Sequence, residues 1–166
     1  MDNTLTLDQR HFIATDLLLA PLVVNILVAW GLAWLIFSGS DAIVLWGPAS
    51  VGEDTIATTF TMPLINTLIV ATLTRRAAGS GRIPRVEPER LRGLGWLPDN
   101  RLLRALLLAA ISLCTAGPIA VVVLTNGFDF PMDVQTLLIW KVAMAVVMAP
   151  PLSLLAGLPE IRAPRP

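Results

Sequence analysis

Residues 17–37 read LLLAPLVVNILVAWGLAWLIF, a run of 21 residues without a charged side chain. A helix needs about 20 mainly apolar residues to cross a hydrocarbon core roughly 30 Å thick. Three other stretches are similar: residues 105–124 and 56–73 are uncharged, and residues 134–155 contain one charge, Lys141. The sequence therefore predicts four transmembrane helices.

The composition of the whole chain agrees with this prediction. Of the 166 residues, 55% are apolar and 14% are charged, whereas an ordinary soluble domain has about 45–50% and about 25%. Four buried core helices in a water-soluble protein would leave no amphipathic layer to cover them. We predict an all-α polytopic membrane protein with four transmembrane helices in an up-down bundle. A single membrane domain (1–166) would have spans at about 16–37, 56–73, 102–124 and 134–155.

The basic residues predict the orientation of the spans. The connections at 38–55 and 125–133 contain no lysine or arginine, but they carry five acidic residues. Apart from Lys141, every lysine and arginine lies in the tails or in the connection at 74–104. Because basic residues stay on the cytoplasmic side, we expect a multi-pass protein of a cell inner membrane. Both termini and an arginine-rich loop at 74–101 would face the cytoplasm.

The arginine-rich loop is also a candidate for lipid contact. Basic residues next to an anionic membrane surface contribute about 1 kcal/mol each, although holding the orientation would by itself explain a positive loop. The candidate ligands for anionic lipid headgroups are Arg75, Arg76, Arg82, Arg85, Arg90 and Arg92. Acidic residues interrupt the run, so we expect no nucleic acid. Besides the lipid bilayer, the expected partner is a second copy of the chain or another membrane protein.

Polar residues within the spans are the candidates for function. At about 1.5 Å of rise per residue, Asn25, Asn66 and Lys141 lie at depths that agree to within about one turn. Thr115 on the third span reaches a similar level. A polar layer shared by all four helices is therefore a hypothesis that the sequence raises.

Two interpretations of these residues remain open. A lysine within the membrane is by default a functional candidate that faces protein or water, but its long stem also lets the ammonium reach outward, toward Asp133 or Asp129. Asn25 and Asn66 are more often residues that join helices by hydrogen bonds.

Each of the four spans contains a proline, with Pro21 in the first. Pro63, Pro118 and Pro150 are candidate kinks, because a proline frees a carbonyl one turn earlier in its helix. Threonines near Pro63 can satisfy backbone groups that the proline frees. Kinked, polar-lined helices suit a transport path or a hinge, and they equally suit a packed bundle of irregular helices.

Helix starts can be predicted from residues whose side chains accept hydrogen bonds from free backbone amides. The candidate caps, in chain order, are Thr6 with Gln9 as a capping box, Asp54 or Thr55, Asp99 or Asn100, and Asp133.

No catalytic constellation is visible. The chain has one histidine and one cysteine, too few for a histidine and cysteine metal cluster, and we expect no enzyme activity, no metal and no cofactor. We favour a small accessory or structural membrane protein. The alternative is a small oligomeric transporter or channel with a polar path around Lys141, Asn25 and Asn66, and a lipid-modifying enzyme comes third. Convergence of the three side chains on a cavity would favour transport, whereas close packing would favour a structural role.

Overall fold

The computed structural model describes residues 7–40, 42–81, 83, 86 and 93–161. The first long rod combines α1 (Leu7–Phe12), the π-helical segment η1 (Ile13–Leu19) and α2 (Ala20–Phe37). The other elements are α3 (Val51–Gly79), α4 (Arg101–Gly127), α5 (Val134–Gly157) and the short 3-10 helix η3 (Leu158–Ile161). Within the described residues the fold is all-helical without strands, which confirms the predicted up-down bundle.

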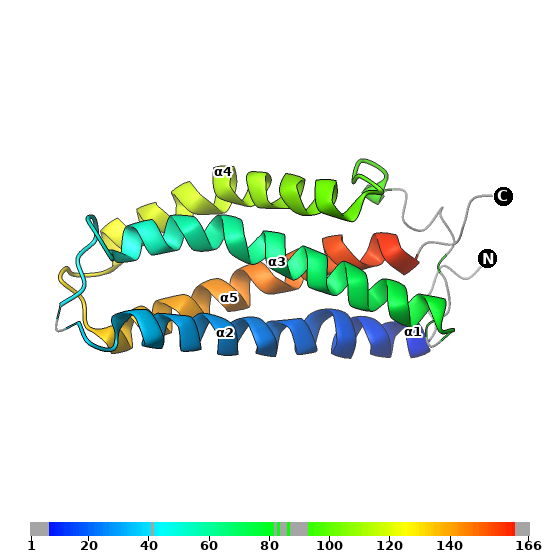
Figure 1. Cartoon of the computed structure of the whole chain (residues 1–166), viewed down its shortest axis with the longest axis horizontal. Helices are drawn as coiled ribbons and strands as arrows, with labels where there is room; N and C mark the ends of the chain where they lie inside the picture. The colour runs from blue at the N-terminus through cyan, green and yellow to red at the C-terminus, as the bar shows by residue number, and fades with distance from the viewer. Residues whose placement is uncertain (1–6, 41, 82, 84–85, 87–92, 162–166) are drawn as a thin grey trace.

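Four of these rods are long and apolar enough to cross a membrane. They extend from residue 13 to 37, 51 to 79, 101 to 127 and 134 to 161, and each contains one predicted span. The chain is a multi-pass membrane protein. The first and last described helices, α1 and η3, lie at one end of the bundle, here called the terminal end (Figure 1). The connections that follow α2 and α4 lie at the opposite, distal end.

The helices do not pack in chain order. The chain forms two helical hairpins, α2 with α3 and α4 with α5. The second helices of the hairpins, α3 and α5, run in the same direction and pack against each other (Figure 1). Helix α4 packs on α3, and α2 packs on α5. Helices that are neighbours in each hairpin, α2 with α3 and α4 with α5, make little contact. Exchanging the two hairpins leaves this pattern unchanged, as expected for a two-fold axis along the membrane normal.

Backbone contacts close the distal end. Ile43 and Met132, one from each distal connection, exchange two backbone hydrogen bonds of 2.9 and 3.0 Å as an isolated antiparallel bridge. Both side chains are buried. The bridge fixes the two hairpins to each other where the chain leaves the helices.

Two of the predicted caps are confirmed. Asn100 accepts hydrogen bonds from the amides of Leu102 and Leu103, and Asp133 accepts one from Thr136 at 2.6 Å.

The predicted cap of the second span is wrong. The cap of α3 is Ser50, which accepts from the amide of Glu53, because the helix begins about one turn earlier than the apolar stretch indicates. Asp54 and Thr55 therefore lie inside α3. The capping box at Thr6 falls outside the described residues.

Small side chains let α3 and α4 approach each other closely, as in many membrane helix pairs. A methyl group on Gly117 would lie 3.3 Å from the Thr59 hydroxyl, tighter than most such contacts. The buried small residues of α4 are Ala105, Ala109, Ser112, Gly117 and Ala120.

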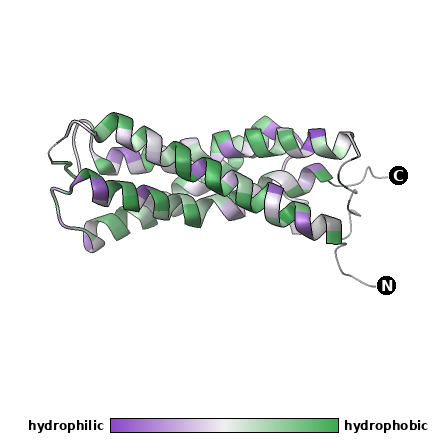
Figure 2. Cartoon of the chain, turned by 90° about the horizontal axis from the view of Figure 1, so that it is seen from below, coloured by the Kyte–Doolittle hydropathy of each residue, from purple (hydrophilic) through white to green (hydrophobic). Residues whose placement is uncertain are grey.

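By contrast, α2 is apolar on nearly all sides, and only Ala33 and Phe37 are buried. Figure 2 shows hydrophobic residues along the whole length of the bundle. Trp30 and Trp34 stack at 6.0 Å and are about half exposed near the distal end of α2, where tryptophans of membrane proteins commonly meet the interface. This surface is suited to lipid.

Candidate functional site: two polar clusters and a groove

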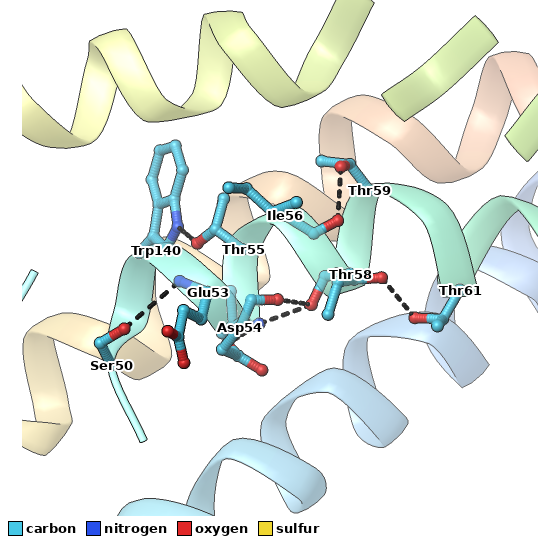
Figure 3. A network of polar contacts seen from close by, with 11 residues as sticks. Ser50, Glu53, Asp54, Thr55, Ile56, Thr58, Thr59, Thr61 and Trp140 are labelled. Carbon is cyan, nitrogen blue, oxygen red and sulfur yellow. Dashed lines mark hydrogen bonds and ion pairs between the residues drawn. The ribbon is translucent and has the colours of Figure 1, made fainter. Parts of the chain in front are cut away.

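Lys141 is part of a compact polar cluster between α5 and α3. Its side chain is only 4% exposed, and its ammonium forms an ion pair with the carboxylate of Asp54. The ammonium also donates a hydrogen bond of 2.7 Å to the Thr58 hydroxyl. This hydroxyl in turn donates to the backbone carbonyl of Asp54 (Figure 3). Lys141, Asp54 and Thr58 are called the lysine cluster below.

The sequence raised two positions for Lys141, a polar layer with the other intramembrane candidates or a side chain that reaches outward to Asp133 or Asp129. The structure shows neither. The ammonium does not join Asn25, Asn66 or Thr115, and its acidic partner is not the expected Asp133 or Asp129. The sequence predicts Asp54 or Thr55 as the cap of the second span, but α3 begins at Val51, and Asp54 lies in its first turn. The lysine therefore reaches toward the distal end through the interior of the bundle and not along its lipid face.

The residues next to this pair make a second contact between the same helices. The Trp140 indole donates a hydrogen bond of 3.1 Å to the hydroxyl of Thr55, and both side chains are buried (Figure 3). The Trp140 ring also meets Phe128 edge to face, with ring centres 5.7 Å apart. A buried indole usually finds such a partner, but the sequence does not reveal which hydroxyl it would be.

A second cluster joins three helices near the middle of the bundle. The amide nitrogen of Asn25 on α2 donates to the Asn66 side-chain oxygen at 2.9 Å and to the Pro21 carbonyl at 2.7 Å. Asn66 on α3 donates to the Ser153 hydroxyl on α5 at 3.2 Å. Asn25, Asn66 and Ser153 are called the asparagine cluster. The structure thus brings the two asparagines together, while Ser153 had no distinguishing signal among apolar neighbours.

The remaining intramembrane candidates lie apart from both clusters. Thr115 is exposed on α4 and donates to the carbonyl of Ile111 in its own helix, at 2.7 Å. Pro63, Pro118 and Pro150 lie inside α3, α4 and α5, and each helix continues past its proline. The kinks stay a prediction.

The arginines divide into several groups. Arg75 and Arg76 are exposed at the end of α3, whereas Arg82, Arg85, Arg90 and Arg92 lie outside the described residues.

Arg104 is different, because it is 1% exposed and forms an ion pair with Glu160 of η3. This pair attaches the first turn of α4 to the chain after α5. From the sequence, Arg104 counts as one of the arginines of the connection at 74–104. Its pairing could not be predicted, because Glu160 lies 56 positions away along the chain.

A groove of about 610 Å³ opens between the first rod and α3 in the terminal half. Its deep end is lined by Asn25 and Asn66, and its lining also includes Asp16, Arg76 and Ser80. Lys141 does not line it. The polar candidates of the sequence are therefore split between a groove and a separate packed interface.

The chain matches no family model, no curated protein and no solved structure in our comparisons. Within the described residues, no group of three or more histidine, cysteine or acidic side chains is placed to hold a metal ion. Any inference about function therefore starts from the two clusters and the groove.

Proposed function

We propose that this protein is an accessory or structural component of a cell inner membrane, with no catalysis of its own. The observation that carries the proposal is the pairing of Lys141 with Asp54 and Thr58 across the α3–α5 interface. A charge within the membrane is expensive unless it is paired. Here the partner belongs to a neighbouring helix, so the charge holds the bundle together.

The rival function, transport through an oligomer, has less support. A polar path would bring Lys141, Asn25 and Asn66 to one water-accessible cavity. The two asparagines line the groove, but Lys141 does not. Each asparagine is also hydrogen-bonded to a neighbouring helix. These contacts favour helix association over conduction.

The proposed orientation has both termini and the arginine-rich loop in the cytoplasm, where the exposed Arg75 and Arg76 would meet anionic lipid headgroups. It is supported by the one-sided distribution of basic residues. The exposed apolar surface of α2 is where we expect a second copy or another membrane protein to pack.

Cysteine labelling tests this orientation. Ser38 and Ser80 are exposed at opposite ends of the bundle, and the exposed Cys114 is first changed to serine. In intact cells, an impermeant thiol reagent should label Ser38→Cys and not Ser80→Cys. The opposite result would reverse the orientation.

Reconstitution tests the absence of transport. Purified protein in proteoliposomes should give proton and potassium fluxes equal to those of protein-free vesicles. A flux above that level that disappears in Lys141→Met would contradict the structural proposal, because it would make the lysine part of a path.

A further inference from the structure

The groove beside the asparagine cluster has one wall formed by the first rod and one formed by α3. Pro21 and Val24 lie on the first rod, and Ile69 and Leu73 lie on α3. Its volume of about 610 Å³ falls within the range of about 300–1,000 Å³ that is usual for small-ligand sites. The lining is mainly apolar, so it is suited to a hydrocarbon chain.

The alignment of the first rod with α3 shows at which depth the charged residues of the groove lie. Asn25 contacts Asn66, and α2 and α3 run in opposite directions. Counting nine residues toward the terminal end leads from Asn25 to Asp16 and from Asn66 to Arg75. Asp16 therefore lies at about the same level as Arg75 and Arg76. Along α3, nine residues correspond to about 13 Å, close to half of the roughly 30 Å hydrocarbon core. The groove therefore extends from the headgroup level to the middle of the membrane.

Its rim carries one charge of each sign. Asp16 belongs to the first rod and Arg76 to α3, and both side chains are exposed. Among the described residues, Asp16 accepts a hydrogen bond from Thr15 at 3.1 Å, and no ion pair includes either charged side chain. The hydroxyl of Ser80 lies on the same rim. A ligand with a phosphate and an ammonium group would complement both charges.

The helix around Asp16 is also unusual. Ile13–Leu19 is π-helical, a rare form that occurs frequently at functional sites. Pro21 lies two residues after its end, and in a regular α-helix the proline ring would clash with the carbonyl of Leu17. Asp16 belongs to this π-helical segment and lines the groove.

The deep end of the groove does not require a polar ligand. The amide groups of Asn25 and Asn66 already bind Pro21, Ser153 and each other. A hydrocarbon chain can therefore pass the asparagines without breaking these hydrogen bonds.

We propose that the groove is a binding site for one phospholipid with a zwitterionic headgroup that ends in a primary amine, as in phosphatidylethanolamine. The phosphate binds Arg76, the ammonium binds Asp16, and one acyl chain occupies the groove. The lipid comes from the leaflet on the side of the chain termini. This inference does not rest on the proposed accessory function, since a transporter could hold the same lipid.

Native mass spectrometry of the full, delipidated chain tests the site. The probes are phosphatidylethanolamine, phosphatidylcholine and phosphatidylglycerol with identical acyl chains. Phosphatidylethanolamine should bind roughly tenfold more tightly than the other two, because among the three headgroups only its ammonium both carries a positive charge and donates hydrogen bonds to Asp16. Asp16→Asn should remove this preference, and Arg76→Gln should weaken the binding of all three lipids.

Two matched tryptophan variants separate the groove from the rest of the lipid-facing surface. Ile69→Trp fills the groove, whereas Val122→Trp changes a similarly exposed residue on α4 that does not line it. Only Ile69→Trp should abolish lipid retention. Should Ile69→Trp fail to fold, the exposed and nearly isosteric Asp16→Asn still decides the question. Equal binding of the three lipids, tightest binding of phosphatidylglycerol, an unchanged preference in Asp16→Asn, or an equal loss in Val122→Trp would each overturn the proposal.

Discussion

The lysine cluster and the asparagine cluster both join α3 to α5, but they differ in charge and surroundings. The lysine cluster is charged and lies inside the distal half, apart from the groove. The asparagine cluster is neutral, adds α2, and lies at the deep end of the groove. An intramembrane charge costs about 2.5–3.5 kcal/mol on insertion scales, whereas an amide needs only hydrogen-bond partners. The difference indicates that the charge deep in the bundle is confined to the closed interface, whereas the deep end of the groove carries neutral polar groups.

Removing the lysine should have the largest effect. Lys141→Leu leaves the carboxylate of Asp54 without its partner, and breaking a buried ion pair costs about 3–5 kcal/mol. Because 24% of the Asp54 side chain is exposed, we expect a value at or below the lower end of that range, in the free energy of unfolding measured in bicelles. Gln135→Leu, an exposed change on the same helix, should stay within about 0.5 kcal/mol. A Lys141→Leu protein as stable as wild type would place the lysine outside the interface.

Removing an asparagine should have a smaller effect. Asn66→Ala loses the hydrogen bonds to Asn25 and Ser153, which are worth about 0.6–2 kcal/mol in membranes. Thr115→Ala is the control, since that hydroxyl is exposed and bonds only within its own helix. The same unfolding measurement should separate the two variants. Equal losses would mean that the asparagine cluster adds nothing to helix association.

The smallest expected effect concerns a helix cap at the distal end. The backbone amide of Thr136 donates to Asp133 and holds the pKa of this exposed carboxyl below its ordinary value of 3.8. The stability contributed by the charged cap is therefore present above that value and is lost as the pH falls through the lowered pKa. Asp133→Ala should lower the Tm slightly at pH 7, and the difference from wild type should shrink below about pH 3.8. Gln135→Leu, an exposed change that removes no titratable group, should show no such pH dependence.

Much of the fold could be predicted because it depends on patterns that are local in the sequence. Apolar runs of sufficient length define the four spans, and Asn100 and Asp133 cap their helices where side-chain chemistry indicates. The start of α3 was missed because its first turn contains Glu53 and Asp54, and an apolar stretch cannot mark a helix turn that carries charges.

The partners within the bundle could not be predicted in the same way. Depth along a helix follows from residue spacing, and it correctly suggested that Asn25 and Asn66 could meet. The direction in which a side chain faces depends on how the helices pack, and Lys141 met Asp54 because α3 lies beside α5. Arg104 and Glu160 pair for the same reason, across 56 positions of the chain.

A double-mutant cycle on Asp54 and Lys141 tests the central claim most directly. The free energy of unfolding in bicelles is measured for wild type, Asp54→Leu, Lys141→Leu and the double variant. If the two charges hold α3 to α5 as a pair, each single change leaves an unpaired charge, and the double variant should recover most of the loss, with a coupling energy above about 1 kcal/mol. Losses that add to within about 0.5 kcal/mol would show that the pair does not join the helices, and the structural role proposed for Lys141 would be wrong.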